Sequence, residues 1–270
     1  MADPSNELLV ALRAQFGDEV LHDHCEGPIV AFRIPDSGGG TPIQLRFAMT
    51  EDAEVRALFL AERAIARKLS HNNIVAVLND GVFEGHPYYA VRRLDPPLGD
   101  RMRDQRLPIT DLLRVLRHVA AALAHCHEKG VVHGAIDPLH ITYGPQGALL
   151  DGFHRAAFIE VFGSPYQEGI ALGTPMYFSP ELCSNQPIDA RSDIYSLGII
   201  AYATLAGEPP FLSADDWVRA RLELDPPTPK LKSPQEKRLY SVIRQMVARD
   251  PAARFQSATA VLRALPDLPG

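Results

Sequence analysis

Cysteine, tryptophan and long apolar runs are scarce in this sequence. Its 270 residues include 3 cysteines and 1 tryptophan. The cysteines are widely separated (Cys25, Cys126 and Cys183), which argues against a disulfide framework and favours a reducing compartment, so we expect a cytoplasmic protein. The longest apolar run, residues 197–206, is much shorter than the about 20 residues that a membrane-spanning helix needs. We therefore expect no membrane span.

A basic surface and a targeting signal are also missing. The sequence has 27 Lys and Arg against 33 Asp and Glu, a formal net charge of −6, and the two signs are interspersed. Without a basic stripe, neither nucleic acid nor an anionic membrane is expected as a partner. Residues 1–7 lack the basic start of a secretory signal.

The sequence does contain enough apolar residues for a core, and its strand patterns come first. At 46% hydrophobic residues, the chain can fill one large domain or two modest lobes. Strands are expected at 28–34, 41–49, 74–78 and 88–91, with a turn at 37–40 and a helix over 50–69. Pro96 and Pro97 then break the chain.

Helix signals dominate the remainder. Helix starts are expected at Thr110, at Ser192, at the capping boxes Ser213–Asp216 and Ser233–Glu236, and at Ser257. Strands followed by helices predict an α+β architecture. We expect a small N-terminal lobe of residues 1–94 and a larger helical lobe of residues 95–270.

Several short motifs, in order and at suitable spacing, resemble those of protein kinases. They are FLAERA (59–64), LSHNNIV (69–75), VVHGAIDPLHI (131–141), GTPMYFSPE (173–181), DIYSLG (193–198) and DPAAR (250–254). The chain is therefore similar to a bacterial-type (Hanks-type) serine/threonine protein kinase domain. This resemblance implies a bilobal kinase fold with a β-rich N-terminal lobe and a helical C-terminal lobe.

The resemblance also assigns structural roles to retained residues. His133 marks the catalytic loop, and Asp193 should accept hydrogen bonds from the backbone of that loop. Glu181 and Arg254 should form a partly buried ion pair, in which the loss of one partner costs about 3–5 kcal/mol.

The residues that the resemblance assigns to chemistry are mostly replaced. Ala135 lies where the family has its base Asp, Asp137 where it has a Lys, and His140 where it has a metal-binding Asn. His140 is a poor ligand for Mg²⁺, which prefers oxygen. Asp151 is retained as a possible metal ligand, but Gly152 follows it where the family has Phe.

The N-terminal lobe departs from the family in the same way. Gly27 alone remains of a glycine-rich loop whose backbone N–H groups would hold phosphates. Arg46 replaces the Lys that pairs with the helix glutamate, here Glu62, and its rigid fork is not equivalent to an ammonium group. Gln44 is expected to fill the adenine slot, unless a shift of one residue in the alignment turns it to solvent.

These changes lead to the expectation of a degenerate pseudokinase without phosphotransferase activity. It would act as a scaffold or allosteric module that binds a signalling protein, as a monomer or weak dimer, with no cofactor. Weak binding of ATP and Mg²⁺ would use the residual positions Gly27, Arg46, Glu62, His140 and Asp151. The expected binding surfaces are the helix around residues 59–64, the segment 151–181 and the region 213–224.

Two active alternatives stay open. In the first, the chain is an atypical ATP-dependent phosphotransferase in which Asp151 acts with His140 or Asp137. In the second, a partner protein supplies the missing base.

Other candidate sites have weaker support. The clusters His22/His24/Cys25 and His125/Cys126/His127 contain metal-ligand residue types, but adjacent residues on a helix do not share a face. Ser164, Tyr166 and Thr174 could accept a phosphate from another kinase, or be ordinary polar loop residues.

Overall fold

The computed structural model describes residues 4–26, 28–35, 41–92, 96–104, 107–165, 173–212 and 216–268. The chain divides into two compact units. The first contains Met1–Ser70 and Val75–Leu94, and the second contains His71–Ile74 and Asp95–Gly270. Within the described residues, no helix combines the length and the apolar character needed to cross a membrane.

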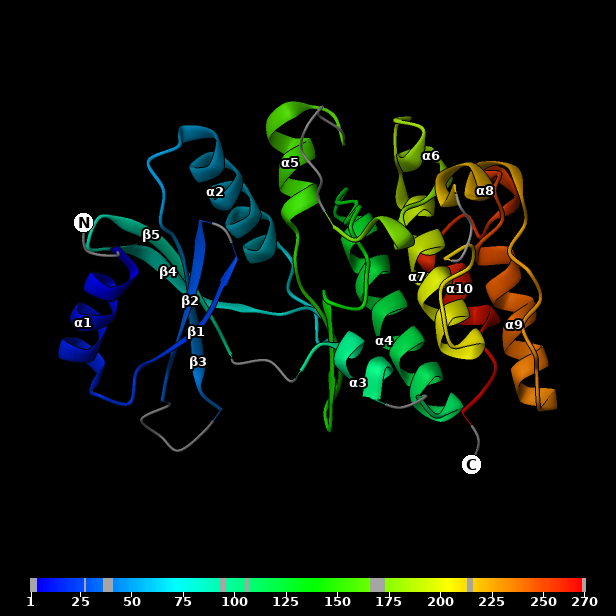
Figure 1. Ribbon diagram of the computed structural model, residues 1–270, viewed down its shortest axis with the longest axis horizontal. Coiled ribbons are helices and arrows are strands. Elements are labelled where there is room, and N and C mark those ends of the chain that lie inside the picture. Colours follow the sequence, from blue (N-terminus) through cyan, green and yellow to red (C-terminus); the bar gives the residue numbers. More distant parts are fainter. Residues whose placement is uncertain are drawn as a thin grey trace. The chain divides into compact units, whose positions relative to one another are not determined.

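The first unit contains an antiparallel sheet in the order β1-β2-β3-β5-β4 (Figure 1). Its strands are β1 (Leu21–Glu26), β2 (Ile29–Ile34), β3 (Ile43–Ala48), β4 (Val77–Phe83) and β5 (His86–Arg92). Apolar residues alternate on β3, where Leu45 and Phe47 are buried, which is the pattern of a strand with one face in a core. The turn expected at 37–40 lies outside the described residues.

Two helices accompany this sheet, and the first was not predicted. In α1 (Pro4–Phe16), Leu8 and Leu12 pack with Val20 against Phe32 and Phe47 of the sheet. The second, α2 (Ala53–Lys68), matches the predicted helix, but it begins after Asp52, whose carboxylate accepts hydrogen bonds from the first turn. The unit therefore has an apolar core between α1 and one face of the sheet.

The second unit is mainly helical. Its helices are α3 (Leu98–Asp104), α4 (Ile109–Glu128), α5 (His154–Phe162), η1 (Pro175–Tyr177), α6 (Pro180–Cys183), α7 (Ala190–Ala206), α8 (Trp217–Glu223), α9 (Pro234–Met246), η2 (Pro251–Ala253) and α10 (Ala258–Ala264). A hairpin of β6 (Ile141–Gly144) and β7 (Gly147–Leu150) precedes α5. Together the two units confirm the predicted α+β architecture.

The C-terminal helices begin largely where capping residues predicted them. Ser233 and Glu236 form the expected capping box of α9. The apolar helix α7 is buried along almost its whole length, but it begins two residues before Ser192, because Asp189 provides its cap. Asp216 caps α8, while the rest of the capping box predicted there, 213–215, lies outside the described residues.

The strand expected at 74–78 was placed too early. Ile74 instead forms an isolated parallel bridge with Leu150, and the Leu150 amide donates to the Asn73 carbonyl over 2.8 Å. These contacts lie within the second unit, whereas β4 begins at Val77 in the first. An apolar run alone does not distinguish a strand from a bridging segment.

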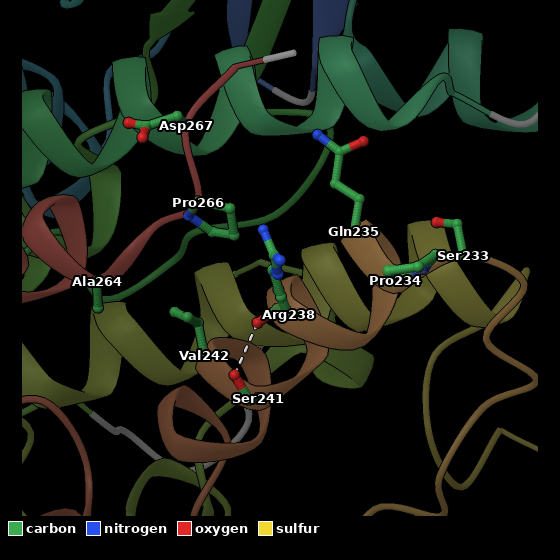
Figure 2. A pocket seen from close by; sticks show the side chains of 9 residues that line it. All are labelled: Ser233, Pro234, Gln235, Arg238, Ser241, Val242, Ala264, Pro266 and Asp267. Carbon is green, nitrogen blue, oxygen red and sulfur yellow. Dashed lines mark hydrogen bonds between the residues drawn. The ribbon is translucent and has the colours of Figure 1, made fainter.

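A hollow of about 780 Å³ lies between α9 and the segment after α10 (Figure 2). Its lining residues are Ser233, Pro234, Gln235, Arg238, Ser241, Val242, Ala264, Pro266 and Asp267. The segment after α10 is held by Arg117, which donates to the carbonyls of Leu265 and Pro266. No kinase-motif residue lines this hollow.

Candidate active site

Asp193 organises the loop in which the catalytic residues were expected. Its side chain is only 1% exposed. Its carboxylate accepts hydrogen bonds from the backbone amides of His133 over 2.9 Å and Gly134 over 2.7 Å, and it lies 2.9 Å from the His127 ring nitrogen Nε2. The buried helix α7 thus fixes the start of the loop through one side chain.

His133 connects this loop to the segment after β7. Its Nδ1 accepts from the Ala135 amide, and its Nε2 donates to the Asp151 carbonyl over 2.9 Å. Because a carbonyl can only accept, these two partners require a neutral imidazole with its proton on Nε2. Complete burial lowers the pKa of His133, in agreement with that neutral form. His133 therefore orients the backbone at Asp151.

Asp137, the one carboxylate of the loop 131–141, accepts several hydrogen bonds. Its Oδ1 accepts from the backbone amides of Leu139 and His140, and its Oδ2 accepts from the Thr174 hydroxyl over 2.6 Å. Although burial opposes the charged form, His140 and these donors lower the pKa of Asp137 to about 2. The residue is therefore ionised at neutral pH.

His140 forms a close pair with Asp137. Its ring nitrogen Nδ1 lies 2.8 Å from Asp137 Oδ1, although the contact lacks the alignment of a straight hydrogen bond. The ring also fills the space beside Gly152, whose backbone has φ +78°, and a Cβ there would lie 2.1 Å from His140 Cδ2. The His at 140 and the Gly at 152 thus compensate for each other sterically.

Ala135 is buried and leaves no side chain for proton transfer. Its methyl group lies 3.3 Å from the place where a Cβ on Gly173 would be. Gly173 also has φ +78°, a conformation that favours glycine. The loop and the segment around Thr174 therefore approach closely because both residues are small.

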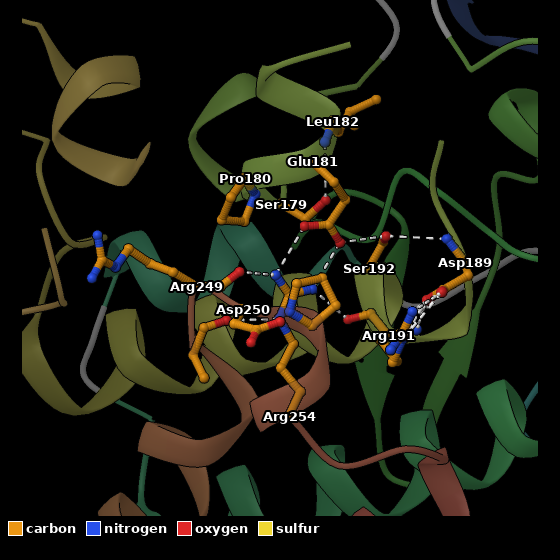
Figure 3. Close-up of polar contacts among 12 residues, drawn as sticks. Ser179, Pro180, Glu181, Leu182, Asp189, Arg191, Ser192, Arg249, Asp250 and Arg254 are labelled. Carbon is orange, nitrogen blue, oxygen red and sulfur yellow. Dashed lines mark hydrogen bonds and ion pairs between the residues drawn. The ribbon is translucent and has the colours of Figure 1, made fainter. Parts of the chain in front are cut away.

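The remaining site residues expected in the second unit lie at the Ser-Pro-Glu motif. Arg254 is fully buried, and its fork donates to Glu181 over 2.7 and 2.9 Å (Figure 3). Three backbone carbonyls accept its other N–H donors. Ser192 donates to the same carboxylate over 2.6 Å. The pair thus joins α6, α7 and the segment after η2.

The site residues expected in the first unit lie on the sheet and on α2. Arg46 donates from Nε to the Gln44 side chain over 2.9 Å and from Nη1 to the Tyr89 hydroxyl over 3.3 Å. Glu62 is half-buried on α2, and Gly27 lies outside the described residues. The expected role of Gln44 in the adenine slot stays a prediction.

Two buried arginines that sequence reasoning missed hold the segment Pro175–Phe178. Arg221 on α8 is 1% exposed and donates to the carbonyls of Pro175, Met176 and Phe178. Arg155 on α5 lies 5.0 Å from the Phe178 ring, and its side chain fills the space that a Cβ on Gly134 would need. Neither position lies in any of the motifs identified above, so sequence reasoning had no signal for these two arginines.

Two side chains of the site, Asp151 and His140, are of types that can ligate a metal ion. Mg²⁺ is usually held by one or two carboxylates plus phosphate oxygens, and Asp151 supplies one carboxylate. The imidazole of His140 supplies nitrogen, which Mg²⁺ does not prefer. Among the described residues, no group of three or more His, Cys, Asp or Glu side chains is placed to hold a metal ion. This includes the described residues of the two His/Cys clusters considered above.

We expect Asp137→Asn to reduce the free energy of unfolding by roughly 2 kcal/mol at pH 7, from the lowering of the pKa from 3.8 to about 2. A carboxyl group with a lowered pKa stabilises the fold above its unfolded pKa, and this contribution is lost as pH falls towards the folded value. The difference between wild type and variant should therefore shrink between pH 4 and 2.

Urea unfolding at a series of pH values measures this difference. Asp225→Asn is a suitable control, because Asp225 is 81% exposed in its ion pair with Arg249 and should change stability by less than about 0.5 kcal/mol. A constant difference between wild type and Asp137→Asn from pH 7 to pH 2 would contradict the assignment.

Comparison with known families identifies the fold. A family model described as protein kinase domain matches residues 46–264. The chain belongs to the protein kinase family. Serine/threonine-protein kinase PknJ of Mycobacterium tuberculosis is 32% identical over 244 residues, which are 86% of this chain and 41% of that protein. PknB of Mycobacterium leprae is 30% identical over 228 residues, 79% of this chain and 36% of PknB.

These relatives overturn one expectation. The replacement of Ala135, Asp137 and His140 had led us to expect a domain that is not an enzyme. The relatives at about 30% identity are serine/threonine-protein kinases, which point to an active kinase, so that expectation was wrong. The kinase domain spans less than half the length of these relatives.

Proposed function

We propose that this kinase domain transfers the γ-phosphoryl group of ATP to a hydroxyl group of a partner protein, using relocated residues. The observation that carries the proposal is the 2.6 Å contact between Asp137 of the catalytic loop and the hydroxyl of Thr174 in the segment 173–181. A buried, ionised carboxylate there binds a hydroxyl of the type that a serine/threonine kinase phosphorylates. The activity of the relatives supports the same reaction.

Asp137 would orient the acceptor hydroxyl, since Ala135 occupies the position where the family has its base. The transition state of phosphoryl transfer is loose in most analyses, so positioning and charge stabilisation contribute more than proton removal. A carboxyl group with a pKa of about 2 is a weak base, which suits orientation. As the substrate oxygen bonds to phosphorus, the bond from phosphorus to the β–γ bridging oxygen breaks, ADP leaves, and the hydroxyl proton is lost to solvent.

In the second unit, His140 and Asp151 would act on the negative charge of the phosphates. The His140 ring, 2.8 Å from Asp137, lies beside the position that the family gives to Lys and would contact the phosphates from there. Asp151 would hold the metal ion, and Arg46 would bind phosphate oxygens. When bound, Mg²⁺·ATP supplies the phosphoryl group and neutralises part of its charge. Because the reaction consumes ATP, we propose that it takes place in the cytoplasm. The proposed substrate is a signalling protein.

Slow ATP turnover that depends on Asp151 is the expected result. A missing base should cost about 10²–10⁴-fold in rate relative to a kinase that has one. Asp151→Asn should lower the remaining turnover by about a hundredfold or more, because it removes the carboxylate that holds the metal ion. Release of ³³P-labelled phosphate and labelling of a generic protein substrate measure the rate.

Asp225→Asn is the matched control and should keep wild-type turnover. It removes an exposed carboxylate of the same unit that is distant in sequence from Asp151. A folded protein that shows no turnover, or whose turnover is the same in Asp151→Asn, would overturn the proposal.

A further inference from the structure

A β-bulge turns Asp23 towards the centre of the sheet. The pairing of β1 with β2 shifts between His22 and His24, so Asp23 is the extra residue of the bulge. Bulges bend a strand and redirect the side chain of the inserted residue, and they are frequent beside active sites. Here the Asp23 carboxylate accepts a hydrogen bond from Gln44 Nε2 over 2.7 Å, although β2 lies between β1 and β3.

The Gln44 side chain continues this contact to Arg46. Its Oε1 accepts from Arg46 Nε over 2.9 Å, and the two residues share a face of β3 because they are two positions apart. Arg46 then donates to the Tyr89 hydroxyl, and its guanidinium carbon lies 5.6 Å from the Tyr89 ring centre. We call these four residues, Asp23, Gln44, Arg46 and Tyr89, the polar chain.

The polar chain is charged at Asp23 and at Arg46 and neutral between them. Both hydrogen bonds of Gln44 involve an ionised partner, and such bonds are about twice as strong as those between neutral groups. Asp23, Gln44 and Arg46 are each half-buried, which reduces the screening of the charges by water. The amide of Gln44 thus couples the carboxylate to the guanidinium across the sheet.

We infer that Asp23 is an internal competitor of nucleotide phosphate for Arg46. The inference rests on the proposed function, in which Arg46 binds phosphate oxygens. An incoming phosphate that binds Arg46 through Nε displaces Gln44 from it, and the nearby carboxylate repels the negative charge of any phosphate at Arg46. Asp23 thereby sets the nucleotide affinity of this domain and favours ligands that carry enough phosphate charge to displace the polar chain.

The test compares ATP with adenosine, which lacks phosphate. Asp23→Asn keeps an acceptor for Gln44 but removes the charge, and Asp23→Ala removes both. Each variant should bind Mg²⁺·ATP about tenfold more tightly than wild type, equivalent to about 1.4 kcal/mol, with no change for adenosine. Isothermal titration calorimetry measures both ligands. Asp18→Asn, an exposed carboxylate of the same unit, is the control and should leave both affinities unchanged.

A double-mutant cycle tests the route through Gln44. Combined with Gln44→Ala, Asp23→Ala should have much less effect on ATP affinity than it has alone, because the coupling amide is gone. Weaker or unchanged ATP binding in both Asp23 variants, or equal gains for ATP and adenosine, would overturn the inference. Tighter ATP binding without Asp151-dependent turnover would uphold it while refuting the proposed phosphotransferase. Asp151-dependent turnover, together with an unchanged ATP affinity in the Asp23 variants, would support the proposed phosphotransferase and refute the inference about Asp23.

Discussion

Glu181→Ala is expected to lower the free energy of unfolding of this kinase domain by about 3–5 kcal/mol. Arg254 has no exposed side-chain area, and all its N–H donors have partners in the wild type. Removing Glu181 leaves the guanidinium buried with only carbonyl acceptors and without a counter-charge at the two donors that faced the carboxylate. Ser192 also loses the acceptor of its hydroxyl. Urea unfolding at pH 7 measures the loss.

Glu223→Ala is the matched control for this change. Glu223 also pairs with an arginine, Arg219, but the two side chains are 56% and 70% exposed, and exposed pairs are worth about 0.2–1 kcal/mol. A similar loss in the two variants would show that burial does not strengthen the Glu181–Arg254 pair.

The pH dependence provides a second check on Glu181. Although burial alone would raise its pKa, Arg254 and Ser192 hold the pKa of Glu181 below its ordinary value of 4.5. A lowered pKa stabilises the fold above pH 4.5, and the contribution disappears as pH falls through the folded value. The difference in stability between wild type and Glu181→Ala should therefore be complete at pH 7 and shrink below pH 4.5.

The parts of the fold that the sequence predicted best have strong local signals. The capping box of α9 and the apolar residues of α7 each determine a helix within one segment. In contrast, α1 was missed, because the residues that it buries, Leu8 and Leu12, form a core only by packing against Phe32 on a distant strand. Contacts of this kind depend on tertiary packing, which a single segment does not reveal.

In the candidate site, too, the sequence predicted the features with a local signal and missed those that depend on tertiary contacts. The motifs predicted that Asp193 would accept hydrogen bonds from the backbone of the loop at His133, but comparison of single positions treated Asp137 and His140 as two separate losses. In the structure they form a close pair, and Gly152 provides the space for the His140 ring. The bulge at Asp23 was likewise invisible, because it depends on how β1 pairs with β2. The expectation of a domain without enzymatic activity came from judging each replaced residue alone, and the serine/threonine-protein kinases among the relatives overturned it.

Asp193→Ala should have the second large effect, and it should act on the candidate site itself. The substitution leaves the buried amides of His133 and Gly134 without an acceptor, and each unsatisfied group costs about 1–3 kcal/mol. The His127 contact is lost as well. We expect a total loss of roughly 2–6 kcal/mol in the free energy of unfolding.

Amide hydrogen exchange separates this local role from general destabilisation. In Asp193→Ala, exchange at His133 and Gly134 should accelerate more than at amides in the middle of α4, because the loop loses its anchor while α4 keeps its own hydrogen bonds. Thr204→Ala on the same helix removes a buried bond to the Ile200 carbonyl and should cost only about 1 kcal/mol without this local change. Uniform acceleration throughout the second unit would contradict a specific anchoring role. Selective acceleration would show that α7 positions the loop, and with it the Asp137–His140 pair on which phosphoryl transfer by this domain would depend.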